Sequence, residues 1–152
     1  MRYSSRVQRS ITVAAPAEKI YPLLADPREW KRWAIWNQRD PAMQIQYSGA
    51  AQGTGAKWSW QSKTEGNGAM EFTAAVPYKH VDYALSFPDV GMSSRGILLL
   101  APDASGTRAT WPNEGDMGSS PINRYFGLMM DSMVGPDFDA GLRNLKALAE
   151  RD

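Results

Sequence analysis

The stretch from Ser120 to about Glu150 constrains the fold most, because its apolar residues recur at the spacing of one long helix. Ser120 is a good N-cap and Pro121 a good first helical residue, since the missing N–H of proline costs nothing there. A helix of about 30 residues is about 45 Å long, enough to cross a small domain. Its apolar face, rich in methionine, consists of Ile122, Phe126, Met129, Met133, Phe138, Leu142, Leu145 and Leu148.

Before this helix, a series of segments alternates apolar and polar residues, which is the period of half-buried strands. Turn residues separate these segments, and Glu65-Gly66-Asn67-Gly68 is typical of a tight hairpin turn. Strands joined in succession by tight turns predict an antiparallel meander. Pro112 predicts a bulge or an edge position, because proline cannot donate to the ladder. The predicted strands are 7–13, 43–48, 57–63, 70–76, 81–87, 94–101 and 107–117.

Two short helices are expected between the first and second strands. The first begins after Ala15-Pro16, and its apolar residues share one face over residues 17–24. Asp26 can cap the second helix and Pro27 fits its first position, so that residues 27–33, with two tryptophans, form about two turns. Residues 36–41 are predicted to be a loop.

The predicted order is therefore one strand, two short helices, about six further strands and a long C-terminal helix. One face of the sheet must be covered, and only the long helix is large enough to cover it. We expect residues 1–152 to form a single α+β domain, in which a curved antiparallel sheet of about seven strands grips the helix. A long helix laid across a sheet either completes a solid core or roofs a cavity.

Composition excludes several classes of function. The 17 basic and 16 acidic residues give a net charge of +1 and the basic residues are scattered, so no nucleic acid is expected as a partner. The absence of cysteine excludes disulfides and a thiolate nucleophile, and a single histidine, His80, argues against a zinc or haem site. We expect no metal and no cofactor. No apolar run approaches a membrane span of ~18 residues, and the first residues lack the apolar core of a signal peptide, so we expect a cytoplasmic protein.

Three stretches of the chain are similar to one known family. They are ITVAAPAEKIYPLLADPREWKRW over 11–33, GTGAKWSWQSKTEGNGAMEF over 53–72 and EGDMGSSPINRYFGLMMDSMVGPDFDAGLRNLK over 114–146. Together with the order of elements, they resemble the START-like or helix-grip (SRPBCC) superfamily, in its polyketide cyclase/dehydrase-like branch. The resemblance implies a helix-grip fold with a deep cavity between sheet and helix that accepts an apolar or aromatic small molecule. It does not imply catalysis, because the superfamily includes carriers, receptors and cyclases.

The candidate ligand-binding residues are aromatic and methionine side chains, which suit an adaptable apolar pocket. Each could equally be an ordinary core residue, and only some of the sheet aromatics are expected to reach a cavity. The candidates are Trp58, Trp60, Phe72, Tyr83 and Trp111 on the sheet, and Phe126, Met129, Met130 and Met133 on the helix.

Candidates for catalysis are weaker. A buried hydroxyl at Tyr83, a carboxylate at Glu114 or the imidazole of His80 could move a proton. The simpler interpretation places His80 in solvent and makes Glu114 part of a surface rim. Glu65 and Asp137 are interpreted as solvent-exposed. No nucleophile–base pair is recognisable.

Three functions remain open. The first is binding or carrying of a small hydrophobic or aromatic molecule, lipids included. The second is a cyclase or dehydratase that acts on a polyketide-like substrate. The third is an interaction module without a ligand, which a large exposed apolar patch would favour. The sequence does not indicate the oligomeric state.

Overall fold

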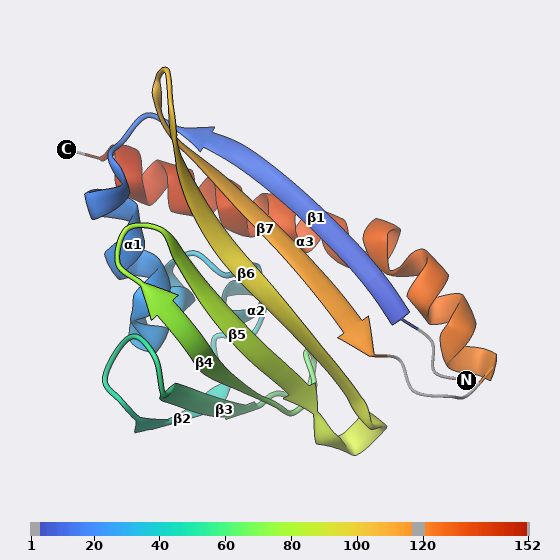
Figure 1. The fold of residues 1–152 in the computed structure, drawn as a ribbon. Helices are drawn as coiled ribbons and strands as arrows, with labels where there is room; N and C mark the ends of the chain where they lie inside the picture. The colour runs from blue at the N-terminus through green and yellow to red at the C-terminus, as the bar shows by residue number, and fades with distance from the viewer. Residues whose placement is uncertain (1–3, 117–120, 152) are drawn as a thin grey trace.

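The alternating segments form a seven-stranded antiparallel sheet that curves around one long helix in the computed structural model, an α+β helix-grip fold (Figure 1). The structure describes residues 4–116 and 121–151, except for the side chains of residues 121–131 and 133. The strands are β1 (Ser4–Val13), β2 (Gln44–Gly49), β3 (Ala56–Gln61), β4 (Gly68–Val76), β5 (His80–Phe87), β6 (Met92–Asp103) and β7 (Gly106–Asp116). The helices are α1 (Ala17–Ala25), α2 (Ile35–Arg39) and α3 (Pro121–Glu150), with 3₁₀ turns η1 (Pro27–Arg32) and η2 (Pro88–Val90).

The strand order is β1-β7-β6-β5-β4-β3-β2, and every neighbouring pair is antiparallel. Strands β2 to β7 form the predicted meander, and β1 adds to its far edge beside β7. Pro112 therefore lies in an interior strand and not at an edge. The ladder between β7 and β6 is interrupted at Trp111 and Pro112, between the pairs Leu99–Thr110 and Gly96–Asn113, where proline has no N–H to donate.

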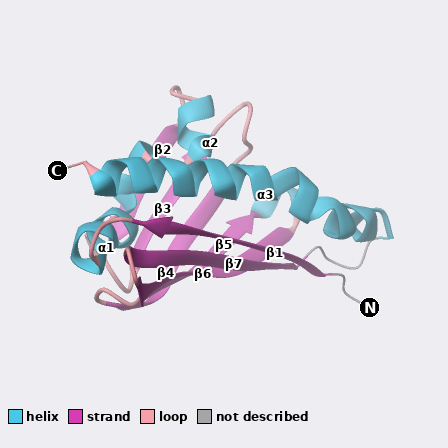
Figure 2. Cartoon of the chain, turned by 90° about the horizontal axis from the view of Figure 1, so that it is seen from above, coloured by secondary structure: helices cyan, strands magenta, loops and turns pink. Residues whose placement is uncertain are grey.

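The long helix α3 lies across one face of the sheet and bends along its length (Figure 2). Pro136 lies inside the helix, where it removes one hydrogen bond of the helical ladder and favours such a bend. The predicted N-cap, Ser120, lies outside the described residues. At the other end, the carboxylate of Glu150 accepts a hydrogen bond from the backbone N–H of Ala14 (2.7 Å), which fastens α3 to the end of β1.

The connection between β1 and β2 differs from prediction in one place. Asp26 caps η1 as expected, since its carboxylate accepts a hydrogen bond from the Arg28 N–H (2.9 Å). The predicted loop over 36–41 is wrong in part, because residues 35–39 form the short helix α2. Contacts of the α2 side chains with a distant segment hold this helix, and local sequence does not reveal them.

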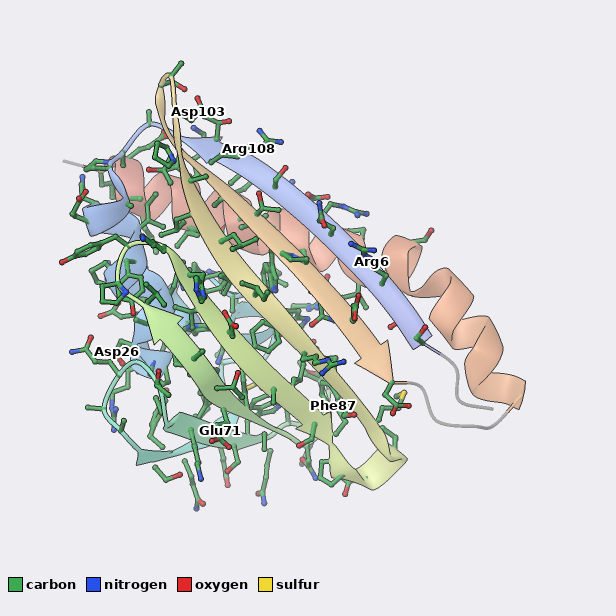
Figure 3. All side chains as sticks on the ribbon, in the orientation of Figure 1. Arg6, Asp26, Glu71, Phe87, Asp103 and Arg108 are labelled. Atoms are coloured by element: carbon green, nitrogen blue, oxygen red, sulfur yellow. The ribbon has the colours of Figure 1, made fainter. Side chains whose placement is uncertain are left out.

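Aromatic rings pack between η1 and the sheet. Figure 3 shows the side chains on the ribbon, crowded where the sheet lies over the helices. Trp30 is the centre of this cluster, with ring centroids 4.6 Å from Trp33, 5.3 Å from Trp58 and 5.9 Å from Phe72. The indole N–H groups of Trp30 and Trp33 donate to the carbonyls of Leu24 and Leu23, each at 2.8 Å. The buried tryptophans therefore satisfy their only polar group, which fixes η1 against α1.

Candidate functional site

A cavity of about 320 Å³ lies between the sheet and the helices α2 and α3. Side chains that point from the strands toward α3 form most of its wall, because alternate residues of each strand face the same side. The helices contribute Trp36, Asn37 and Arg39 from α2 and Val134, Asp137 and Phe138 from α3. The largest lining residues of the sheet are Trp58, Trp60, Met70, Tyr83, Leu85, Phe87 and Trp111. Most of the exposed wall is apolar and eight of its residues are aromatic, as expected of a site for an apolar or planar molecule.

Stacked rings hold α3 to the sheet beside the cavity. The rings of Trp111 and Phe138 lie parallel, with centroids 3.9 Å apart and an interplanar angle of 11°. Trp36 meets both rings edge-on, at 5.9 Å from Trp111 and 6.1 Å from Phe138. Aromatic contacts of this kind contribute about 0.5–1.5 kcal/mol each beyond the area they bury. These contacts therefore hold α3 and α2 against β7 at this corner of the cavity.

A chain of hydrogen bonds crosses the sheet at the cavity wall. The indole Nε1 of Trp111 donates to the Tyr83 hydroxyl (2.8 Å), which in turn donates to Oδ1 of Asn113 (2.6 Å). Burial raises the pKa of Tyr83 far above its ordinary value, and the hydrogen bond from Trp111 only partly opposes this effect. Tyr83 therefore stays neutral throughout the physiological range.

Charged groups from three segments meet at another part of the wall. The guanidinium of Arg39 in α2 lies 2.6 Å from a carboxylate oxygen of Asp137 in α3 and 3.3 Å from Glu65 in the β3–β4 turn. The same oxygen of Asp137 accepts a hydrogen bond from the Trp36 indole (3.1 Å). The hydrogen bond to Asp137 is the main cause that raises the pKa of Arg39. Two carboxylates share one guanidinium, and together the three groups join α2 to α3 and to the sheet.

The structure brings most of the predicted sheet aromatics to this cavity. Trp58, Trp60, Tyr83 and Trp111 all line it. Phe72 is fully buried against Trp30 and Trp58 and does not line the cavity. The side chains of the helical candidates Phe126, Met129, Met130 and Met133 lie outside the described residues.

Two of the three predicted catalytic candidates lie elsewhere. His80 and Asp82 are on the face of β5 opposite Val81 and Tyr83, and the His80 Nδ1 lies 2.6 Å from an Asp82 carboxylate oxygen. Glu114 lines an open hollow of about 800 Å³ on the outer face of the sheet and does not line the cavity under α3. Of the three candidates, only Tyr83 reaches the cavity.

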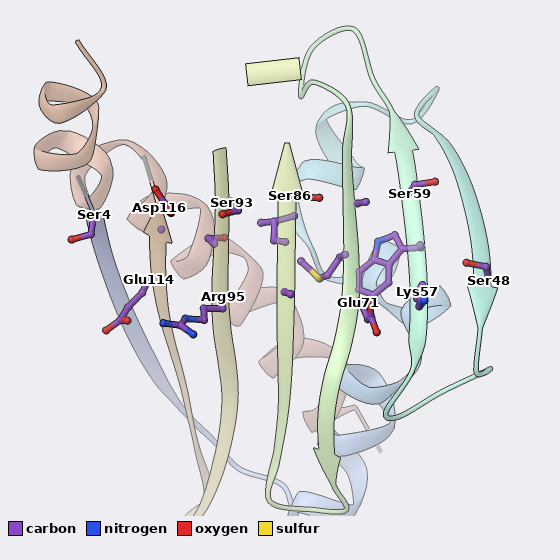
Figure 4. A pocket seen from close by; sticks show the side chains of 17 residues that line it. Ser4, Ser48, Lys57, Ser59, Glu71, Ser86, Ser93, Arg95, Glu114 and Asp116 are labelled. Carbon is purple, nitrogen blue, oxygen red and sulfur yellow. The ribbon is translucent and has the colours of Figure 1, made fainter. Parts of the chain in front are cut away.

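The outer hollow has a floor of small residues and a row of charges (Figure 4). The strand register places Ser93, Ser86, Ala69 and Ser59 side by side across four strands. The neighbouring row runs Glu114, Arg95, Ala84, Glu71 and Lys57, so that opposite charges are adjacent on both sides of Ala84. Opposite charges across neighbouring strands stabilise the register.

Sequence reasoning missed several residues of the cavity wall. Glu65 and Asp137 were predicted to face solvent, yet their side chains are only 15% and 19% exposed and both line the cavity. The place of Asn113 on the cavity side of the sheet could have been predicted, because it is two residues from Trp111 and so shares its strand face. No sequence pattern indicates the pairing of Arg39 with Asp137, since 98 positions separate them.

No three residues of the metal-ligating types come together within the described part of the chain. None of its described helices combines the length and apolar character that crossing a membrane requires.

Solved structures with the same fold are numerous, at low sequence identity. Protein CV1439 from Chromobacterium violaceum is 18% identical, with a TM-score of 0.69 over 97% of this chain and 99% of its own. SA2116 from Staphylococcus aureus, a protein of unknown function, is 10% identical, with a TM-score of 0.74 over 98% of this chain and 95% of its own. A protein from Rhizobium leguminosarum is 14% identical, with a TM-score of 0.70 over 100% and 99%.

Among curated proteins, none matches the chain. The sequence profile of one family, described as polyketide cyclase/dehydrase and lipid transport, matches residues 4–150. This match covers nearly the whole chain and agrees with the fold. The chain therefore belongs to the polyketide cyclase/dehydrase and lipid transport family.

Proposed function

We propose that this protein binds or carries a small hydrophobic or aromatic molecule in the cavity between the sheet and α3. The observation that carries the proposal is the largely apolar wall, with eight aromatic residues, around a space of about 320 Å³. Lipid transport appears in the description of the family, which supports the same class of ligand. The wall also contains polar groups that could orient such a molecule.

The size of the cavity limits the ligand. A protein cavity of about 150 Å³ accommodates benzene, so a space about twice as large suits a molecule of two fused rings. Burial of ~300 Å² of apolar surface would contribute about 7.5 kcal/mol. Association costs at least about 4 kcal/mol, so ring stacking and polar contacts decide the final affinity.

Isothermal titration calorimetry with a naphthalene-class probe tests the proposal. Leu85→Trp would fill the cavity, since Leu85 lines it, and should abolish binding. Leu99→Trp is the matched control, because Leu99 is 38% exposed and lies away from the cavity. The proposal fails if the wild-type protein binds no probe, or if both variants bind as the wild type does.

A cyclase or dehydratase acting on a polyketide-like substrate is the second candidate. The carboxylates of Glu65 and Asp137 on the cavity wall favour it, because such groups can transfer protons to and from a bound substrate. Loss of turnover in Asp137→Asn, with the fold intact by circular dichroism, would support this candidate. If the protein binds polyketide-like molecules but converts none of them, the result would contradict the enzyme candidate and favour the carrier function.

A further inference from the structure

The buried hydroxyl of Tyr83 has a fixed place in the sheet. Gly96 is its cross-strand partner on β6, and a β-carbon at Gly96 would lie 2.3 Å from the hydroxyl oxygen. The ring of Tyr83 therefore occupies the space that a side chain at position 96 would take. Its hydroxyl is held between Trp111 and Asn113 and cannot rotate toward other groups without leaving them.

The direction of the two hydrogen bonds follows from the chemistry of the three groups. The indole N–H of Trp111 can only donate, so the Tyr83 oxygen must accept from it. The hydroxyl proton of Tyr83 then needs an acceptor, because an unsatisfied buried donor costs about 1–3 kcal/mol. On Asn113 only Oδ1 can accept, so the amide is fixed with its NH₂ group turned away from Tyr83.

The NH₂ group of Asn113 has no hydrogen-bond partner within the described residues, and Asn113 lines the cavity. We propose that Asn113 Nδ2 donates a hydrogen bond to an oxygen acceptor of the bound molecule, such as the carbonyl of an aromatic ketone. This inference rests on the proposed function and adds the polarity of the ligand to it. Asn113 determines specificity, and Tyr83 is a positioning residue that acts through Asn113.

Several other polar groups of the wall are already engaged with protein partners. Arg39 pairs with Asp137 and Glu65, and these carboxylates can only accept while they are ionised. The Tyr83 proton is directed to Asn113 and the Trp111 N–H to Tyr83. A ligand with an acceptor oxygen therefore gains a partner at Asn113 that a hydrocarbon of the same shape does not.

Two probes of similar shape test the inference. 2-Acetylnaphthalene carries a ketone, and 2-isopropylnaphthalene replaces the oxygen by a methyl group. The selectivity is the dissociation constant of the hydrocarbon divided by that of the ketone. We expect this ratio to be about 2- to 10-fold larger in the wild-type protein than in Asn113→Asp. Aspartate keeps an acceptor for Tyr83 but loses the NH₂ donor. Equal ratios in the two proteins would overturn the inference.

Asn67→Asp is the matched control. Asn67 also accepts through Oδ1, from the Ser62 N–H (3.3 Å), and donates through Nδ2, to Asp89 (2.9 Å), but it lies outside the cavity. This variant should keep the wild-type ratio, and a loss of selectivity equal to that of Asn113→Asp would contradict a specific role for Asn113.

A second measurement needs no variant at Asn113. In the wild-type ¹⁵N–¹H spectrum, the side-chain amide signal of Asn113 should shift with the ketone and move less with the hydrocarbon. Tyr83→Phe, which releases the amide, should reduce the selectivity while both probes still bind. Equal shifts with the two probes, or full selectivity in Tyr83→Phe, would overturn the assigned roles. If neither probe binds the wild-type protein, the proposed function fails and this inference fails with it.

Discussion

The close approach of Tyr83 to Gly96 allows a quantitative test of the site. In Gly96→Ala, the new β-carbon would lie 2.3 Å from the Tyr83 hydroxyl oxygen and 2.5 Å from Cζ of its ring. Both distances are far below van der Waals contact, so the ring or the strand must move. Tyr83 is only 2% exposed, and any movement of its ring away from Gly96 displaces the hydroxyl from Trp111 and Asn113.

Two contributions lower the free energy of unfolding of Gly96→Ala. Forcing an extra methyl group into a packed interior costs about 1–3 kcal/mol. Moving the hydroxyl away from Trp111 and Asn113 weakens two hydrogen bonds, each with a net contribution of about 0.5–1.5 kcal/mol. We therefore expect a loss of about 2–6 kcal/mol in the free energy of unfolding, a large part of the 5–15 kcal/mol that is typical of natural proteins.

Urea unfolding followed by circular dichroism measures this loss. Gly141→Ala is the matched control, because its new β-carbon would meet the rings of Trp33 and Trp111 at ordinary distances of 3.5 and 3.6 Å. In the interior of α3 that change should stabilise the protein by about 0.5–1 kcal/mol. The same substitution thus has opposite effects at the two sites. A Gly96→Ala protein within 0.5 kcal/mol of the wild type would refute the reasoning.

Two substitutions and one titration test other parts of the structure. Asp137→Asn should lower the free energy of unfolding, measured in urea, by about 1 kcal/mol. The value is modest because the Arg39 side chain is 44% exposed and its charge is screened by solvent. An unchanged free energy of unfolding would mean that the pair of Arg39 and Asp137 does not stabilise the fold. Phe138→Ala, which removes the ring stacked on β7, should cost about 3–5 kcal/mol in thermal unfolding, and a cost below 1 kcal/mol would contradict the packing. NMR titration should give Glu150 a pKa below 4.5, chiefly because its carboxylate accepts a hydrogen bond from Lys146. Its stabilising effect is present above the unfolded-state pKa and is lost as the pH falls through the folded-state value, so a pKa at or above 4.5 would contradict the contact.

The fold could be predicted because its signals are local. The spacing of apolar residues over α3 and the alternation along the strands depend only on neighbours a few positions apart. The hairpin turns then fixed the order of β2 to β7. The helix α2 was missed because it has only five residues, too few to show a helical period, and contacts with α3 hold it.

The site could be predicted only in part, for a related reason. Alternation indicates which face of a strand a side chain occupies, and it correctly grouped Trp58 and Tyr83 on the covered face, whereas the facing of Trp111 could not be assigned beside Pro112. It does not indicate which part of that face lies under α1 and η1, where Phe72 is buried, and which part faces the cavity. The charged group around Arg39 unites three distant segments, and no pattern in any one of them indicates the others.

The aromatic cluster also allows occupancy of the cavity to be followed by intrinsic tryptophan fluorescence. All six tryptophans of the chain belong to one continuous network of ring contacts that runs from Trp60 through Trp58, Trp30 and Trp33 to Trp111 and Trp36. Indoles this close exchange excitation energy and couple their electronic transitions. A bound molecule that quenches one indole in the cavity should therefore lower the fluorescence of its neighbours as well. Ligand binding can then be measured without an extrinsic dye.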